Sequence, residues 1–308
     1  MDSVIIHRGA QTPEYIRHFV HQFYTFNRLK KLWLIIENSD KLAKTLLSDY
    51  PCVQTVLLDS IPPQKERKFF MKWNRMNHAF RGGFWRYAIE RFFILHDFMS
   101  SQGIKTIIHF EYDNMIYFDI EKLSRAFDGT TQGISLPADS NKRCIPSVVF
   151  IKDVAVLQRF CATYNTCYLP LKYNDMIAFS KFSKKKKNAC SFLPLVPSWY
   201  KDGKTYFSSA SGKKCKDIDL FDSGYSEFNG VFDAAAIGQY LGGVDPRNDN
   251  ALGPGFINET AMYSPADMKF EWQKDEEDRL IPYGEYAGQK FRIFNLHIHS
   301  KGLEKFRS

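Results

Sequence analysis

The sequence predicts an α/β fold in which a mostly parallel central sheet is flanked by helices. Short apolar runs alternate with segments of helical spacing over the first 128 residues, and these segments are long enough for crossovers between parallel strands. Of the 308 residues, 44% are hydrophobic, which is enough for a large core. Because neither an 18-residue apolar stretch nor a signal-peptide pattern occurs, we expect a soluble protein that stays in the cytoplasm.

The N-terminal segment is predicted to be βαβαβ. Thr12 is expected to cap the first helix, with Pro13 at the first position, where a missing N–H is tolerated. Ile16, Phe19 and Phe23 then recur on one helical face. Strands are expected at 4–7, 32–36 and 53–58, and a second helix at about 40–47.

A polar, aromatic and basic segment over 61–83 precedes a long helix, "FWRYAIERFFILHDFMSSQ", which Gly103 should end. The next apolar run, "IIHFEYDNMIYF", is interrupted by Glu111, Asp113 and Asn114. Ligands of open α/β sheets bind at the carboxyl ends of the strands. We therefore expect the two carboxylates at a turn on the functional edge of the sheet.

Shorter elements are expected in the C-terminal half. "GISLPA", "PSVVFI" and "MIAFS" are predicted strands, with a helix over 154–164 and long loops over 179–229 that cover an active site. A further helix should begin at Asp233 and end at Gly242 and Gly243. "FRIFNLHIHSKGLEKF" should close the chain as a strand and a basic tail.

The net charge of +8 favours an anionic partner, but the densest basic runs have Ser, Gly and Asn neighbours, which favour solvated loops. These runs are Lys184–Lys187 and Lys213, Lys214 and Lys216. No helix-turn-helix, zinc-finger or RRM signature accompanies them, so we expect no nucleic acid partner. The six cysteines form no CxxC pair and are interpreted as reduced structural thiols.

Two motifs indicate chemistry. Glu111-x-Asp113 suits Mn²⁺ or Mg²⁺, which takes one or two carboxylates and substrate phosphate oxygens, although a capped polar turn would have the same residues. His297 and His299 alternate along the last strand and so share a face, with Lys301 and Lys305 close behind. Imidazole ligates Mn²⁺ and ammonium groups neutralise a diphosphate, so together the motifs predict a metal and diphosphate site.

Over most of its length the chain resembles glycosyltransferases of the GT-A fold, particularly divergent members from large DNA viruses and bacteria. The resemblance lies in "HRGAQTPEYI", "FWRYAIERFFIL", "HFEYDN" as the DxD motif, "VFDAAAIGQYLGGVDPRN" and "LHIHSK". It implies one continuous domain, with a nucleotide-sugar-binding half over 1–128 and an acceptor-binding half with a smaller mixed sheet over 129–308.

The resemblance also implies roles for single residues. Glu111 replaces the first Asp of the motif, so Asp113 is the expected metal ligand and Glu111 contacts the ribose or a metal-bound water. The spacing His299-x-x-Gly302-x-x-Lys305 is similar to that of glycogenin-like transferases, which implies a metal ligand at His299 and a diphosphate contact at Lys305. His297 could replace His299 as the metal ligand, and Lys301 could replace Lys305 at the diphosphate. Lys301 is also expected to contact the donor. Arg8 should touch the base or ribose of the donor.

The implied reaction is metal-dependent transfer of a hexose or pentose from a nucleotide sugar, with a UDP-sugar expected, to a hydroxyl of a glycan or glycoprotein. Asp233 stands where inverting members place their base, Glu227 is the second choice, and simple helix capping is the competing role for Asp233. The glycogenin-like spacing favours retention instead. The expected location is the cytoplasm of a microbe or of a virus-infected host cell.

Two other classes of function remain. A nucleotidyl- or phosphoryl-transfer enzyme would share the sheet and the acids, but neither GxxxxGK[ST] nor GxGxxG occurs. A basic module that binds nucleic acid or anionic glycans would show salt-dependent binding without a metal.

Arg91 is expected to pair with a carboxylate on its own helix.

Overall fold

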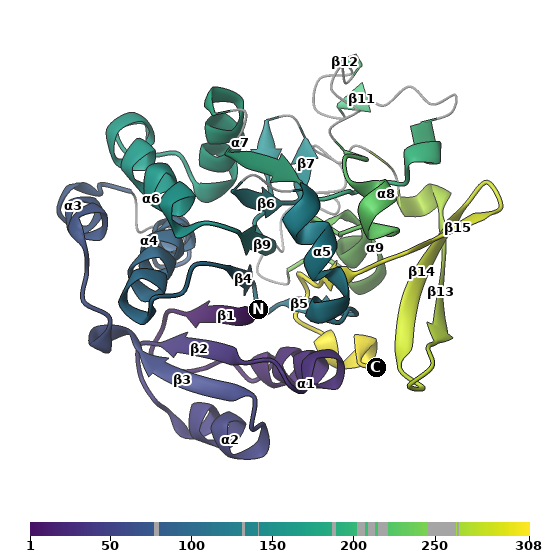
Figure 1. The fold of residues 1–308 in the computed structure, drawn as a ribbon, viewed down its shortest axis with the longest axis horizontal. Coiled ribbons are helices and arrows are strands. Elements are labelled where there is room, and N and C mark those ends of the chain that lie inside the picture. The colour runs from purple at the N-terminus through teal and green to yellow at the C-terminus, as the bar shows by residue number, and fades with distance from the viewer. Residues whose placement is uncertain are drawn as a thin grey trace.

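The computed structural model describes residues 1–76, 80–130, 133–140, 142–186, 189–201, 207–208, 213–214, 221–245, 263 and 265–308. Its centre is a seven-stranded sheet (Figure 1). From edge to edge the strands are β10 (Cys190–Phe192), β6 (Ile134–Leu136), β9 (Val148–Ile151), β4 (Ile107–Phe110), β1 (Asp2–His7), β2 (Leu32–Ile36) and β3 (Val53–Leu57). The predicted fold class is confirmed.

Every strand pairing in this sheet is parallel except the two made by β9, which runs antiparallel to β4 and β6. β4 is the middle strand and is completely buried. The apolar run that carries the acids therefore forms the centre of the sheet. Its continuous hydrophobic residues predict such a strand, buried on both faces.

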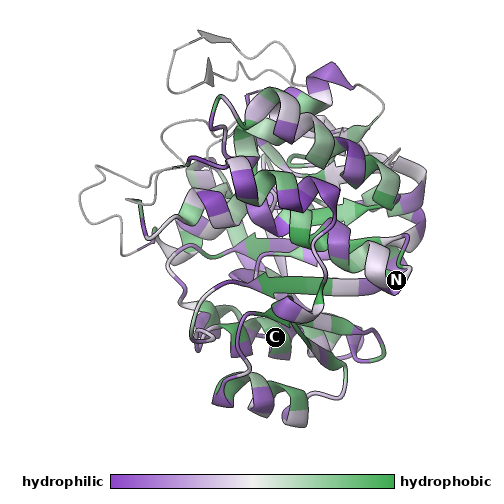
Figure 2. Cartoon of the chain, turned by 90° about the vertical axis from the view of Figure 1, so that its left-hand side faces the viewer, coloured by the Kyte–Doolittle hydropathy of each residue, from purple (hydrophilic) through white to green (hydrophobic). Residues whose placement is uncertain are grey.

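Helices cover both faces of the sheet. α1 (Ile16–Asn27) and α2 (Lys41–Asp49) lie on one side, and α3 (Lys65–Trp73), α4 (Phe84–Gln102) and α6 (Val154–Thr163) pack together on the other (Figure 1). The remaining helices are α5 (Ile120–Thr130), α7 (Asp175–Lys185), α8 (Tyr225–Phe228) and α9 (Ala236–Gly242). Figure 2 shows mostly hydrophobic strands between helices that carry both kinds of residue, the pattern of one buried core.

Capping explains where several helices begin and end. The Asp40 side chain accepts from the Ala43 N–H and starts α2, and Gly103 ends α4 in the left-handed conformation, at φ 64°. The prediction that Thr12 caps α1 is wrong: α1 begins at Ile16, and the Thr12 N–H donates to Asp40 instead (2.5 Å). Asp40 thus ties the turn after β1 to the helix after β2.

The smaller sheets carry the C-terminal part of the chain. β13 (Lys269–Lys274), β14 (Leu280–Tyr286) and β15 (Gln289–Arg292) form an antiparallel meander. The described residues form three further strand pairs: β16 (Asn295–His297) with β5 (Asn114–Ile116), β7 (Ala138–Ser140) with β8 (Arg143–Cys144), and β11 (Phe207–Ser208) with β12 (Lys213–Lys214). The expected terminal strand is thus two strands, and it is followed by the 3-10 turn η7 (Leu303–Phe306).

Two predictions of local structure are wrong. "MIAFS" lies in α7, because the Asn174 side chain accepts from the Ile177 N–H and helical spacing buries Met176 and Phe179. The segment 61–83 contains α3, which the dense polar and basic residues conceal. Part of the predicted loop region forms α7 and β10. Lys187, Lys216 and the end of "VFDAAAIGQYLGGVDPRN" lie outside the described residues.

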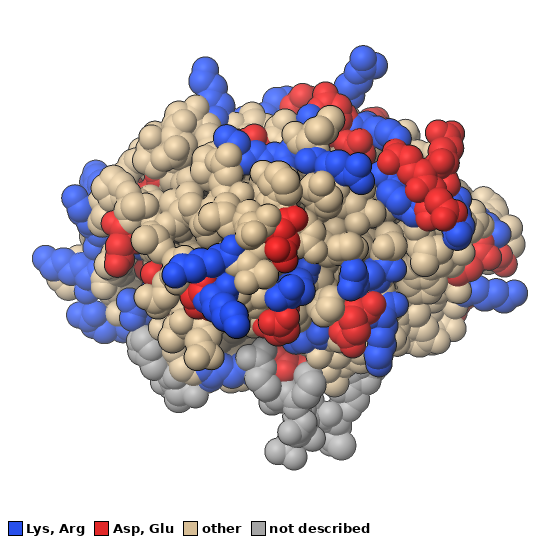
Figure 3. All heavy atoms as spheres, turned by 90° about the horizontal axis from the view of Figure 1, so that it is seen from below, with Lys and Arg blue, Asp and Glu red and all other residues tan. Residues whose placement is uncertain are grey.

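In the part of the chain that the structure describes, no helix combines the length and apolarity of a membrane span. On the face seen from below, basic side chains alternate with acidic ones over the surface (Figure 3). That mixture differs from the continuous basic track that would follow a nucleic acid backbone.

Candidate metal and diphosphate site

The turn after β4 holds the two acids in place. The Glu111 N–H donates to the Ser147 carbonyl (2.9 Å), and the Asn114 side chain donates to the same carbonyl (3.1 Å). The chain then enters β5 at Asn114. The carboxylates therefore lie between two buried strands at the carboxyl end of the central strand, as the sequence predicts.

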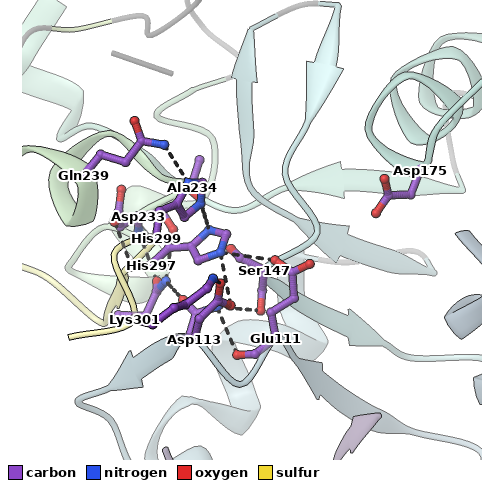
Figure 4. Close-up of polar contacts among 12 residues, drawn as sticks. Glu111, Asp113, Ser147, Asp175, Asp233, Ala234, Gln239, His297, His299 and Lys301 are labelled. Atoms are coloured by element: carbon purple, nitrogen blue, oxygen red, sulfur yellow. Dashed lines mark hydrogen bonds and ion pairs between the residues drawn. The ribbon is translucent and has the colours of Figure 1, made fainter. Parts of the chain in front are cut away.

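Antiparallel pairing of β16 with β5 brings the C-terminal motif to this turn. His297 is the pairing partner of Asn114, and the Ile298 N–H donates to the Asp113 carbonyl (2.8 Å). In this register Nε2 of His297 lies 3.3 Å from Oε2 of Glu111 and 3.3 Å from Oδ1 of Asp113 (Figure 4). Segments far apart in the sequence thus converge on one point.

A buried polar network fixes this register. The side-chain nitrogen of Asn295 donates to Oδ1 of Asn114 (2.7 Å). The side-chain oxygen of Asn295 accepts from the Asp233 N–H (3.0 Å). Gly238 of α9 lies directly on His297, since a Cβ atom there would be 2.2 Å from the His297 carbonyl oxygen. Only glycine permits this approach. Sequence analysis missed Asn295 and Gly238, which have no signal of their own.

The donor set fits a divalent cation. One ligand atom each from Glu111, Asp113 and His297 lies within 4.8 Å of the others. Nδ1 of His297 is 2.8 Å from the Ala234 carbonyl, which can only accept, so Nδ1 carries the hydrogen and Nε2 is the ligand atom. Two carboxylates and an imidazole suit Mn²⁺, and the carboxylates also suit Mg²⁺.

Without a cation, a proton occupies this position. Burial opposes protonation, but the Asp113 and Glu111 carboxylates raise the pKa of His297 to about 9. Burial likewise disfavours the ionised Asp113 carboxyl, yet Lys301 and His297 hold its pKa well below the usual range. The site therefore places two cationic groups, His297 and Lys301, directly beside the ionised Asp113 carboxylate.

His299, the predicted metal ligand, is set back from the carboxylates. Its Nε2 is 3.4 Å from Nδ1 of His297, and its Nδ1 is 2.7 Å from the Gln239 amide nitrogen (Figure 4). Burial and the nearby His297 charge lower its pKa well below the usual value. Of the two histidines, the structure brings His297 to the acids.

The two predicted lysines differ in the same way. Nζ of Lys301 pairs with Oδ2 of Asp113, and its backbone is left-handed at φ 66°. Lys305 lies on η7 and is exposed. Among the described residues Lys305 makes no ion pair with either carboxylate, so Lys301 is the lysine at the site.

Arg91 is a site residue that sequence analysis assigned wrongly. Its guanidinium pairs with Glu111 and with Asp175 of α7 (2.7 Å), not with a carboxylate of its own helix. Arg91 thus fixes the Glu111 side chain from behind. Burial raises the pKa of Asp175 despite the nearby Arg91 charge.

Arg8 lies at the end of β1, where two acids hold it. Its Nε is 2.5 Å from Glu37 and one terminal nitrogen is 3.1 Å from the buried Glu90. The Arg8 guanidinium also lies 5.0 Å from the centre of the Tyr87 ring. The described contacts of Arg8 are therefore with two acids and one aromatic ring of the protein itself, and its contact with a donor stays a prediction.

Asp233, the predicted base, is fully buried. Its carboxylate accepts from the N–H groups of Ile237 (3.0 Å), Gly238 (2.8 Å) and His297 (3.0 Å). These bonds join the start of α9 to β16, so Asp233 acts as a capping residue. Glu227 is exposed on α8, and its carboxylate accepts from Ser226 (2.7 Å).

No protein-family model and no curated protein sequence matches the chain. Partial similarity extends to solved structures. Mouse xyloside xylosyltransferase 1 is 12% identical, with 73% of this chain aligned to 93% of that one at a TM-score of 0.44. Galactosyltransferase LgtC, in complex with donor and acceptor sugar analogs, is 10% identical over 73% of this chain and 83% of that one, at 0.41. A cytidylyltransferase from Leptospira borgpetersenii is 12% identical over 63% and 75%, at 0.37.

Glycosyltransferases recur among these structures, and nucleotidyltransferases are also present. At these TM-scores the similarity alone does not define an activity.

Proposed function

We propose that the chain is a metal-dependent glycosyltransferase that moves a sugar from a nucleotide-sugar donor, a UDP-sugar, to a hydroxyl of a glycan or glycoprotein. The observation that carries the proposal is the convergence of Glu111, Asp113 and His297 at the carboxyl end of the central strand. The GT-A resemblance of the motifs that supply these residues agrees with it.

Each side chain has a defined task in this proposal. Glu111, Asp113 and His297 hold Mn²⁺ or Mg²⁺, with Arg91 orienting Glu111. When bound, the cation supplies Lewis-acid stabilisation of the leaving diphosphate. Lys301, beside Asp113, adds positive charge at the same place, and such preorganised charge lowers the barrier to departure of the diphosphate.

The proposal assigns Asp233 a structural role. A general base needs an oxygen within reach of the acceptor hydroxyl, whereas both Asp233 oxygens accept backbone N–H groups in a fully buried position. The expectation of inversion depended on Asp233, so this assignment removes its support. The anomeric configuration of the product decides between inversion and retention.

Calorimetric titration with UDP and GDP, with and without Mn²⁺, tests the site. We expect Mn²⁺-dependent binding of one nucleoside diphosphate, lost in Asp113→Asn. Glu227→Gln is a matched control, because this exposed acid lies on α8 and outside the site. Metal-independent binding, or unchanged binding by Asp113→Asn, would disprove the metal and diphosphate assignment.

A product assay separates the two transferase classes. A glycosyltransferase releases a nucleoside diphosphate from a nucleotide sugar, whereas a nucleotidyltransferase releases pyrophosphate from a nucleoside triphosphate and a sugar phosphate. We expect diphosphate release from a UDP-sugar, and slow donor hydrolysis suffices to detect it without the acceptor. Pyrophosphate release would instead establish nucleotidyl transfer at the same site.

A further inference from the structure

The outer face of α3 carries aromatic and basic side chains side by side. Arg67 and Phe70 are the buried residues of this helix, which packs on α4 and α6 at the outside of the molecule (Figure 1). We call the exposed residues that helical spacing places on one side of the helix the α3 face: Lys65, Lys68, Phe69, Lys72 and Trp73. The two aromatic side chains of this face, Phe69 and Trp73, are 43% and 50% exposed.

Exposed apolar residues are frequent on this helix. Among the described residues, ten large hydrophobic side chains are exposed, and three of them, Phe69, Met71 and Trp73, are on α3. Single exposed hydrophobic residues are ordinary, but a cluster marks a surface that binds something. The rings of Phe69 and Trp73 are neighbours, with their centres 6.2 Å apart.

The charge of the α3 face is of one sign. Its exposed ionisable residues are lysines, and Nζ of Lys72 lies 5.2 Å from the centre of the Trp73 ring. The one acid of the helix, Glu66, is half-buried and accepts from the Asn165 amide (2.9 Å). A partner must therefore be negatively charged and must also accept aromatic side chains.

We propose that the α3 face binds the surface of an anionic lipid bilayer. Lipid phosphates pair with the lysines, and the headgroup boundary accepts Trp73 and Phe69, since aromatic rings prefer that depth. A single-stranded nucleic acid is instead held in a basic groove beside stacking rings, whereas the α3 face is the outer surface of one helix (Figure 1). The contact is peripheral, and it does not depend on the proposed catalytic activity.

Co-sedimentation with phosphatidylcholine vesicles, with and without phosphatidylserine, tests this proposal. Wild-type protein should bind the anionic vesicles, less so as salt rises. The double variant Lys68→Ala, Lys72→Ala should lower the partition coefficient about 25-fold, because each basic residue contributes about fivefold at an anionic surface. Phe69→Ala with Trp73→Ala should lower it by about tenfold or more.

A matched control lies on α2, where Lys41 and Lys44 are also exposed. Lys41→Ala with Lys44→Ala removes the same net charge and should change partitioning by less than about threefold. Circular dichroism and thermal unfolding establish that each variant folds, which is expected because every changed side chain is exposed.

Three results would overturn the proposal. The first is no binding of the wild-type protein to anionic vesicles at low salt. The second is an equal loss in the α2 control, which would mean that net charge alone drives binding. The third is a concentration-dependent dimer, seen by light scattering, that Phe69→Ala with Trp73→Ala abolishes while vesicle binding stays unchanged; the α3 face would then join two copies of the chain.

Discussion

Nε2 of His297 lies 3.3 Å from Oδ1 of Asp113, although β16 and the turn after β4 are far apart in the sequence. The contact depends on one strand pairing, in which His297 is opposite Asn114. It places an imidazole with a fixed tautomer against two acids, which is the arrangement of a carboxylate and imidazole metal site.

The first prediction separates the two histidines. His297→Ala should weaken Mn²⁺ binding about 100-fold or more, because it removes a ligand atom. His299→Ala should weaken it about tenfold, because His299 lies against His297 and supports it, which is the smaller role. Titration of both variants with Mn²⁺, followed by calorimetry, makes the comparison. A larger loss in His299→Ala would restore the original prediction that His299 is the ligand.

The second prediction concerns Asp233. Asp233→Asn should lower the free energy of unfolding by about 3 kcal/mol or more, because the buried carboxylate accepts three backbone N–H groups and an amide has only one oxygen. Urea unfolding measures this change. A variant with wild-type stability and a kcat reduced about 1000-fold would instead show that Asp233 is the base.

The third prediction uses the left-handed backbone of Lys301. Lys301→Ala and Lys301→Gly both remove the ammonium group, so both should weaken diphosphate binding. The glycine variant should be about 1 kcal/mol more stable than the alanine variant, because φ is 66° at this position. Thermal unfolding of the pair checks it, and equal stabilities would show that the turn relaxes once the ion pair with Asp113 is gone.

The fourth prediction concerns pH. Burial, together with the Arg91 charge, lowers the pKa of His109 to about 3, whereas the unfolded chain has the usual value of about 6.5. Between these values the unfolded state binds a proton that the folded state does not, so the free energy of unfolding falls as the pH falls from 6.5 toward 3.

Between pH 7.5 and pH 5 this one group should cost about 2 kcal/mol of stability. Urea unfolding of wild type and His109→Gln at the two pH values isolates the effect, since only the wild type carries the His109 contribution. An equal loss of stability in both proteins would contradict the neutral buried state of His109.

The sequence predicted most of the N-terminal half because its signals are local. Apolar runs defined β1, β2, β3 and β4, Gly103 marked the end of α4, and the acids that interrupt a buried strand indicated the site. Local signals failed where polar residues pack inward. α3 was missed because Arg67 is buried against Glu90 and Asp97 of α4, and the spacing of residues in the sequence does not predict that contact.

By itself, the sequence determined that two carboxylates stand at the end of a central strand and that histidines and lysines follow at the C-terminus. Only the tertiary structure decided which histidine and which lysine meet the acids. His297 and His299 share the same alternation, so pattern alone cannot choose between them. The choice comes from the register of β16 on β5, which Asn295, Asp233 and Gly238 fix through buried hydrogen bonds and close backbone contact.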